Sequence, residues 1–283
     1  MKIDENRAGA LYIVATPIGN LEDITLRALR ILREANIIAC EDTRRTKKLL
    51  NAYAITTPLI SLHEHNEKEK SIFVIAKIKS GMQVAYVTDA GTPCISDPGY
   101  LLVQAVRGET LPVIPVPGAS AVITALSVSG FPVDNFIFYG FPPPKQGKRK
   151  HFFEQLKTEE KTIVFYESPA RYLAMLQDMR EVLGDREIVV TRELTKIYEE
   201  IKHGKISYFL KDALPARTRG EFTIIVQGKE KEPPVFTCED IERKLLPLLA
   251  NKEISLRDAV AEIVCQTGFS KKKIYDLAVK LKR

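Results

Sequence analysis

The sequence contains no tryptophan and only four cysteines among its 283 residues. The cysteines (Cys40, Cys94, Cys238 and Cys265) are far apart and form no C-x-x-C pair, which argues against a disulfide framework and against a zinc site. No apolar run approaches the length of a membrane-spanning helix, and the first residues lack the hydrophobic stretch of a signal peptide. We therefore expect a cytoplasmic protein with reduced thiols and no membrane partner.

Several common functional motifs are also absent. There is no G-x-G-x-x-G, so the sequence lacks a dinucleotide-binding fingerprint. Residues 140–149 resemble a P-loop only superficially, because the glycine spacing differs and no Ser or Thr follows Lys148. His63 and His65 have no second cluster of ligand-type residues at matching spacing, so we predict no metal site. No G-x-S-x-G marks a hydrolase nucleophile.

The composition is that of a globular protein, with 45% hydrophobic and 28% charged residues. The length suggests two domains with a small third. The net charge of +6 modestly favours a polyanionic partner, although an excess of lysine also serves solubility.

Apolar runs and helical periodicity alternate through the first part of the chain. This alternation predicts βαβ units, with a mostly parallel sheet and helices on both faces. Ser96 or Asp97 is expected to cap the helix at 100–106. The predicted strands are 10–15, 37–40, 59–62, 84–87 and 113–116, and the predicted helices are 23–34, 46–52, 67–80, 100–106 and 121–128.

A second α/β region with a mixed sheet follows, and then a small helical unit. Its predicted strands are 136–139, 162–166, 187–191 and 221–226, and its predicted helices are 151–156, 170–183 and 206–210. Beyond a proline-containing linker, helices at 240–250, 255–265 and 271–282 with a turn at Gly268 favour a helix-turn-helix-like arrangement. We therefore divide the chain into domains at 1–118, 119–230 and 235–283, of which the first two are α/β.

Chemically dense turns follow the predicted parallel strands. They are TPIGN (16–20), EDTRR (41–45), HEHN (63–66), DAGTP (89–93) and PGAS (117–120). Ligands of open α/β sheets bind beyond the carboxyl ends of the strands, and Gly91 permits close approach of the backbone to a ligand. The sequence therefore predicts a ligand site where these turns meet.

Taken together and in order, these segments resemble the tetrapyrrole methylase superfamily of S-adenosylmethionine-dependent methyltransferases. The resemblance implies two α/β domains of the tetrapyrrole methylase type, with the cofactor in the cleft between them, and a homodimer. The matching segments are residues 11–26, 40–46, 61–66, 87–99, 115–121, 138–143, 164–169 and 219–226.

Within that superfamily the sequence is most similar to enzymes that 2′-O-methylate a cytidine ribose in the decoding region of 16S rRNA. The resemblance thus implies S-adenosylmethionine as cofactor and 16S rRNA, within the small ribosomal subunit, as partner. Related enzymes have Gly-Asp-Pro where this chain has Gly91-Thr92-Pro93, so that acid is missing. The residues implied to hold the cofactor are Pro17, Asp89, Gly91, Thr92, Ile95, Ser120, Ala121 and Tyr166.

Methyl transfer to a ribose hydroxyl requires a group that removes a proton. The candidates are Asp42, His63 and Glu64, together with Glu41, at the expected strand ends; Asp23 and Glu167 are weaker candidates. Asp42 is equally compatible with an ion-paired loop carboxylate, and His63 with a hydrogen-bonded structural residue.

Basic side chains near these turns are candidates for phosphate contacts, with a solvated basic surface as the alternative. They are Arg44, Arg45, Lys47 and Lys48 in one segment and Lys145, Lys148, Arg149 and Lys150 in another. Residues 271–283 add six basic residues against one acid. These cations favour RNA over two other interpretations, a methylase of a tetrapyrrole precursor or other small substrate on the same fold, and a non-catalytic RNA-binding module.

Overall fold

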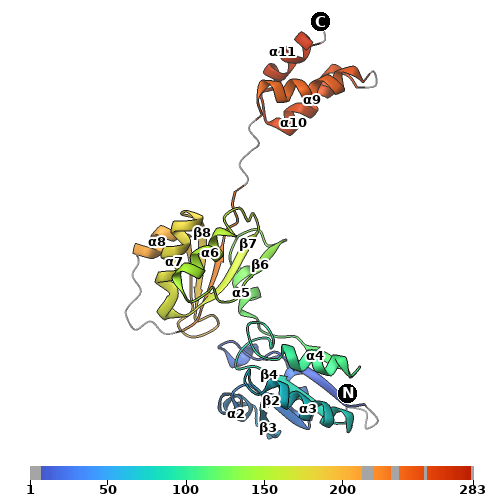
Figure 1. Cartoon of the computed structure of the whole chain (residues 1–283), viewed down its shortest axis with the longest axis vertical. Helices are drawn as coiled ribbons and strands as arrows, with labels where there is room; N and C mark the ends of the chain where they lie inside the picture. The colour runs from blue at the N-terminus through green and yellow to red at the C-terminus, as the bar shows by residue number, and fades with distance from the viewer. Residues whose placement is uncertain (1–7, 212–219, 231–235, 252–253, 282–283) are drawn as a thin grey trace. The chain divides into compact units, whose positions relative to one another are not determined.

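The computed structural model describes residues 8–211, 220–230, 236–251 and 254–281. The chain divides into two compact units, residues 1–229 and residues 230–283. The first unit contains two five-stranded sheets, and the second is helical (Figure 1). None of the described helices combines the length and apolar character that a bilayer span requires.

The first sheet is entirely parallel, with the strand order β3-β2-β4-β1-β5. Its strands are β1 (Ala10–Val14), β2 (Ile37–Cys40), β3 (Leu59–Ser61), β4 (Gln83–Val87) and β5 (Val113–Val116). The central strand β4 is buried along its whole length, as expected of a strand covered on both faces. This arrangement confirms the predicted parallel sheet.

Helices cover both faces of this sheet. They are α1 (Leu26–Glu34), α2 (Thr43–Ala52), α3 (Glu67–Lys79) and α4 (Tyr100–Gly108), and a short 3-10 helix, η1 (Leu21–Asp23), precedes α1. Ala85 and Val87 of β4 pack with α1 and α2, whereas Val84 and Tyr86 pack with α3 and α4. Successive strand residues point to opposite faces, so one strand contributes to both layers of the core.

The second sheet is mixed, with the strand order β6-β7-β10-β8-β9. Its strands are β6 (Phe136–Phe138), β7 (Thr162–Glu167), β8 (Glu187–Arg192), β9 (Glu200–Lys205) and β10 (Phe222–Val226), and only the β6–β7 pair is parallel. Helix α5 (Ala121–Ser127) packs on one face. Helices α6 (Gln146–Glu154), α7 (Pro169–Leu183) and α8 (Ile206–Lys211) pack on the other.

The sequence analysis missed β9 and misplaced α6. The edge strand β9 reads EIKHGK and has no apolar run to reveal it. Helix α6 begins at Gln146 rather than at residue 151, so the basic segment is helical. Arg149 on this helix is buried, and its guanidinium nitrogen NH2 lies 2.5 Å from the Asp178 carboxylate of α7. This ion pair attaches α6 to α7. Its two residues are far apart in the sequence, so the residues around Arg149 do not reveal it.

Helix α4 begins at Tyr100 with Gly99 in the N-cap position, and neither Ser96 nor Asp97 caps it. The buried carboxylate of Glu67, on α3, instead accepts hydrogen bonds from the backbone N–H groups of Gly99 (3.1 Å) and Leu102 (2.9 Å). The first N–H groups of a helix have no partner within it, so an acceptor from another helix can serve as the cap. The predicted cap is therefore wrong, and Ser96 and Asp97 are available for other roles.

The C-terminal unit consists of α9 (Cys238–Ala250), α10 (Leu256–Thr267) and α11 (Lys271–Leu281). The three helices share a core that includes Ile241, Leu245, Val260, Ile263 and Ile274. Gly268 ends α10 in the left-handed conformation (φ 69°), as predicted for the turn. Lys282 and Arg283, which contribute to the basic character of this segment, lie outside the described residues.

Candidate active site

Three turns of the first unit meet at the carboxyl end of the parallel sheet. The N–H of Thr16 donates to the carbonyl of Gly91 (2.9 Å), and the N–H of Gly91 donates back (3.1 Å). The hydroxyl of Thr92 donates to the carbonyl of Ala119 (3.1 Å), which joins the loop after β4 to the turn before α5. Gly91 adopts a positive φ of 80°, so its lack of a Cβ favours this geometry.

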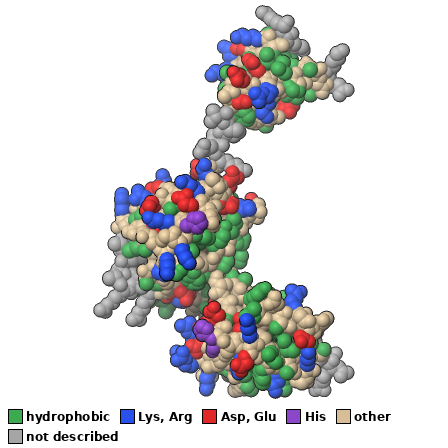
Figure 2. All heavy atoms as spheres, viewed as in Figure 1, with side chains coloured by type: hydrophobic (Ala, Val, Ile, Leu, Met, Phe, Trp, Pro, Cys, Tyr) green, Lys and Arg blue, Asp and Glu red, His purple; other side chains and the backbone are tan. Residues whose placement is uncertain are grey.

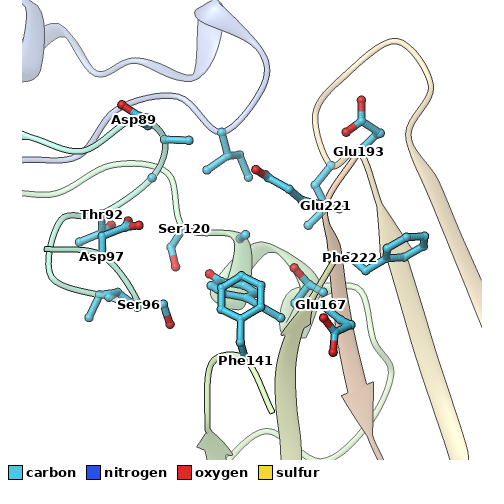
Figure 3. Close-up of a pocket in the computed structure, with 18 of the residues that line it drawn as sticks. Asp89, Thr92, Ser96, Asp97, Ser120, Phe141, Glu167, Glu193, Glu221 and Phe222 are labelled. Carbon is cyan, nitrogen blue, oxygen red and sulfur yellow. The ribbon is translucent and has the colours of Figure 1, made fainter. Parts of the chain in front are cut away.

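A cavity of about 270 Å³ lies beside these turns (Figure 3). The second sheet closes its other side with residues at the ends of β7 and β8 and the start of β10. The lining residues are Ile18, Glu41, Arg45, Asp89, Ala90, Gly91, Thr92, Ile95, Ser96, Asp97, Ser120, Ala121, Phe141, Tyr166, Glu167, Glu193, Leu194, Lys196, Glu221, Phe222 and Thr223. The cavity lies where the sequence predicts a ligand site, at the carboxyl ends of the strands.

Most residues predicted to hold a cofactor line this cavity. They are Asp89, Gly91, Thr92, Ile95, Ser120, Ala121 and Tyr166. Pro17 does not line it, but its neighbour Ile18 does. The structure therefore brings the predicted residues together, and their role as cofactor ligands stays a prediction.

The residues predicted as catalytic bases do not line the cavity: Asp42, His63 and Glu64 all lie outside it. Asp42 is the N-cap of α2 and accepts from the N–H and the guanidinium of Arg44. These hydrogen bonds from Arg44 hold the pKa of Asp42 down at about 2, which makes it a weak proton acceptor. Of the alternatives weighed with them, Glu41 and Glu167 do line the cavity.

Asp89 is held between two segments at the mouth of the cavity. One carboxylate oxygen accepts from the backbone N–H of Asp42 (3.2 Å), and the other pairs with the guanidinium of Arg45 (3.0 Å). Both partners belong to the start of α2, so Asp89 fixes the end of β4 against this helix.

Asp97 is the carboxylate whose protonation is most perturbed in the cavity. Burial raises the pKa of Asp97 to about 6, and the negative charges of Glu41, Asp89 and Glu221 act in the same direction, while a hydrogen bond with Thr88 opposes them. The Thr88 hydroxyl also donates to Glu41 (3.1 Å). A hydroxyl has one proton, so Thr88 cannot donate to Glu41 and Asp97 at the same time. When Asp97 carries a proton, Thr88 can donate to Glu41 and accept from Asp97.

On the other side of the cavity, Tyr166 and Glu167 end strand β7. Tyr166 makes edge and tilted ring contacts with Phe138 and Phe141, and burial raises the pKa of its hydroxyl to about 12, so it stays neutral. The buried carboxylate of Glu167 accepts from the N–H of Ser168 (2.8 Å) and pairs with Arg171 (3.0 Å). Burial raises the pKa of Glu167.

The donor set of the cavity fits S-adenosylmethionine. Acidic side chains outnumber the two basic ones, Arg45 and Lys196, which suits a ligand with a sulfonium and an ammonium group. Apolar side chains are available for an adenine ring. The acidic residues are Glu41, Asp89, Asp97, Glu167, Glu193 and Glu221, and the apolar ones include Ile18, Ile95, Ala121, Phe141 and Leu194. In the described part of the chain, no three His, Cys, Asp or Glu residues are arranged to hold a metal ion.

The basic residues predicted to contact RNA fall into two groups. The side chains of Arg44 and Arg45 on α2 are largely exposed (87% and 68%), and Figure 2 shows basic side chains beside the histidines of the N-terminal half. In the second group, Lys145 and Lys148 are exposed, whereas Lys150 pairs with Glu181 (2.7 Å). Arg149 is buried against Asp178, so it is removed from the predicted RNA-contacting set.

Four residues that line the cavity were not predicted from the sequence: Asp97, Glu193, Lys196 and Glu221. Asp97 was assigned to a helix cap because it precedes Pro98. Glu193 and Lys196 lie in the segment after β8, where the polar string RELTK was the available signal. Glu221 precedes β10 in the matched segment 219–226, whose first residue lies outside the described residues.

The family model of the Tetrapyrrole (Corrin/Porphyrin) Methylases matches residues 10–209. Relatives named ribosomal RNA small subunit methyltransferase I are similar over most of the chain. The relative from Thermotoga maritima is 48% identical over 78% of this chain and 100% of its own length. The one from Haemophilus influenzae is 44% identical over 96% of each chain.

Solved structures share the fold at lower identity. Cobalt precorrin-4 methyltransferase, a cobalamin biosynthetic enzyme, is 18% identical, with a TM-score of 0.57 over 78% of this chain and 95% of that one. Uroporphyrin-III C-methyltransferase from Thermus thermophilus, complexed with S-adenosylhomocysteine, is 17% identical, with a TM-score of 0.55 over 76% of this chain and 97% of that one. The chain therefore belongs to the tetrapyrrole methylase family of methyltransferases, in the group of ribosomal RNA small subunit methyltransferase I.

Proposed function

We propose that this protein transfers a methyl group from S-adenosylmethionine to the 2′-oxygen of a cytidine ribose in the decoding region of 16S rRNA, within the small ribosomal subunit. The observation that carries the proposal is the 41–48% identity to relatives named for ribosomal RNA small subunit methylation. The cavity supports the cofactor assignment, because its residues come from the same turns that the family resemblance singled out.

When bound, S-adenosylmethionine supplies a methyl group on a positively charged sulfur. The backbone of Gly91 and the side chains of Thr92 and Ser120, which line the cavity, are the proposed contacts for this ligand at the strand ends. The acidic lining compensates its positive charge. As the bond between the ribose oxygen and the methyl carbon forms and the bond between that carbon and sulfur breaks, the hydroxyl proton must pass to an acceptor.

We assign proton acceptance to Asp97 in place of Asp42, His63 and Glu64. Asp97 lines the cavity, and its pKa of about 6 leaves it ionised at neutral pH yet more basic than an ordinary carboxylate. The three bases predicted from the sequence lie outside the cavity. Phe141 and Tyr166, whose ring centroids lie 5.6 Å apart, form an aromatic side of the same cavity.

The exposed cations at the start of α2 are the proposed contacts for the RNA backbone, together with Lys145 and Lys148. Arg45 is central to this set because it reaches both solvent and the cavity. We further propose a homodimer in the cytoplasm, as the family resemblance implies.

Two competing functions make different demands on the site. A carboxylate-rich tetrapyrrole precursor would need far fewer cations than the exposed basic side chains at the start of α2 supply, which disfavours it. A non-catalytic RNA-binding module has no need of a cavity built from the ends of so many strands. Both therefore account for fewer of the observations than an RNA methyltransferase does.

The test is transfer of labelled methyl from S-adenosylmethionine to small ribosomal subunits that lack the modification, with free 16S rRNA and a tetrapyrrole precursor in parallel. Nuclease mapping then locates the label. Label on a cytidine ribose of the rRNA is the expected result. Label on the tetrapyrrole, or cofactor binding without label on RNA, would overturn the proposal.

A further inference from the structure

The loop between β8 and β9, residues 193–199, presents two large apolar side chains to solvent. Ile197 is 93% exposed and Tyr198 is 75% exposed. Exposure of this degree is costly for an aliphatic and an aromatic side chain that stand next to each other, and such exposed pairs mark interaction sites. The charged residues Lys196 and Glu199 flank the pair in the sequence.

The loop is held in place rather than loosely connected. The N–H of Thr195 donates to the Glu199 carboxylate (2.6 Å), and the Lys196 ammonium group pairs with Glu193 (2.8 Å). Glu193 and Thr195 adopt left-handed backbone conformations (φ 51° and 67°), which non-glycine residues rarely do without compensating contacts. The backbone that carries Ile197 and Tyr198 is therefore held in one conformation by contacts within the loop.

The same loop forms part of the cavity. Glu193, Leu194 and Lys196 line it, and the loop packs against the turn after β1. A Cβ added to Gly19 of that turn would meet the side chain of Lys196 and lie 2.9 Å from the carbonyl oxygen of Leu194. Ile197 and Tyr198 follow the cavity-lining Lys196 directly in the chain, so the loop that borders the cavity also carries the exposed pair (Figure 3 shows Glu193 on this loop).

We propose that the 193–199 loop is a nucleobase platform, on which Tyr198, supported by Ile197, stacks against a base of the RNA strand whose ribose enters the cavity. This inference rests on the proposed function. Every base has a flat face that an aromatic ring can stack upon, and single-stranded RNA is commonly recognised in this way. Lys196 and Arg45 line the same cavity, so cations for the adjoining phosphates lie next to the platform.

The chemistry of the loop favours RNA over a protein partner. A stable interface between copies of this chain needs a broad apolar centre, whereas within the 193–199 loop the two exposed apolar side chains stand between the charged residues Lys196 and Glu199. A stacked nucleobase needs only one exposed ring near the reacting ribose. Tyr198 supplies such a ring on the loop that borders the cavity.

The experiment compares the full-length protein with Tyr198→Ala and Tyr198→Phe. Tyr208→Ala is the matched control, because Tyr208 is also half-exposed (51%) but lies on α8, past the far end of β9. Steady-state methylation of unmodified small subunits gives kcat and KM. Fluorescence anisotropy with a labelled five-nucleotide RNA containing a central cytidine gives a dissociation constant in the presence of S-adenosylhomocysteine, and calorimetry gives the affinity for S-adenosylhomocysteine itself.

The expected result for Tyr198→Ala is an increase of about 5- to 150-fold in KM and in the dissociation constant for the RNA, the range that loss of one base–aromatic stack produces. Tyr198→Phe and Tyr208→Ala should stay within about twofold of the unaltered protein, because the phenyl ring still stacks and Tyr208 is remote. The affinity for S-adenosylhomocysteine should not change in any variant, which separates a lost RNA contact from misfolding.

Three outcomes would overturn the platform: unchanged RNA affinity in Tyr198→Ala, an equal loss in Tyr208→Ala, or a change of oligomeric state in Tyr198→Ala measured by sedimentation. The last would mean that a second copy of the chain covers the loop. If the unaltered protein methylates no rRNA, the proposed function fails on its own, and the RNA dissociation constants still test the platform.

Discussion

Replacing Asp97 by Asn should make the α/β unit more stable at neutral pH while it disables methyl transfer. In the native protein, burial raises the pKa of Asp97 from 3.8 to about 6. Between pH 3.8 and about pH 6, Asp97 is mostly protonated in the native state and mostly ionised in the unfolded state. The free energy of unfolding therefore falls as pH rises through this window, and above about pH 6 the full penalty of a buried negative charge remains.

The size of the effect follows from the shift. A change of about 2 pKa units corresponds to about 3 kcal/mol at 1.36 kcal/mol per unit. The neutral amide of Asn carries no such penalty. The free energy of unfolding of Asp97→Asn should thus exceed that of the unaltered protein by up to about 3 kcal/mol at pH 8. The two free energies should converge near pH 4.

Urea unfolding followed by circular dichroism at pH 4, 6 and 8 measures this difference, since the chain has no tryptophan to serve as a fluorescent probe. Methyl transfer by the same variant should fall by at least about a hundredfold, the usual contribution of a general base. A variant that is less stable at pH 8, or a stability difference that is the same at all three pH values, would refute the raised pKa. Retained activity would refute the catalytic assignment.

Three further outcomes follow from other contacts. Arg149→Ala should lower the free energy of unfolding by about 3–5 kcal/mol, because it leaves Asp178 buried without its partner; urea titration against Lys148→Ala, which should change it by less than about 0.5 kcal/mol, checks this. Glu67→Ala should lower the free energy of unfolding by about 2–3 kcal/mol, because two buried N–H groups at the start of α4 lose their acceptor. Glu67→Gln keeps an acceptor oxygen, so its melting temperature should stay closer to that of the unaltered protein than the melting temperature of Glu67→Ala. Asp42→Ala should leave kcat within about threefold, since its carboxylate lies outside the cavity, and a loss as large as that of Asp97→Asn would restore it as the base.

The described strands other than β9 were predictable because each is a short apolar run followed by a polar or Gly- and Pro-containing turn. Those turns also led to the predicted ligand site at the strand ends, and the turns containing Gly91 and Ser120 do line the cavity. Elements without an apolar signal were missed. The edge strand β9 alternates exposed and half-buried residues, and α6 begins within a run of basic residues.

The roles of charged side chains were much harder to predict. Asp42 and Arg149 both belong to polar segments that are natural candidates for chemistry or RNA contact. The structure shows one as a helix cap with a lowered pKa and the other as half of a buried ion pair. Neither outcome can be read from neighbouring residues alone, because burial depends on which other segment packs there.

The sequence by itself determined the α/β architecture, the mostly parallel character of the first sheet and the identity of turns that line the cavity, because hydrophobic periodicity and turn chemistry act over short stretches of chain. The order of the strands within the sheet came from the tertiary structure. Only the tertiary structure decided which charges act. The pKa of Asp97 depends on burial and on Glu41, Asp89 and Glu221, which come from three separate segments of the chain. Electrostatic interactions depend on distance and burial in the folded protein rather than on separation in the sequence, so Asp97 could be proposed as the proton acceptor only once the segments were assembled.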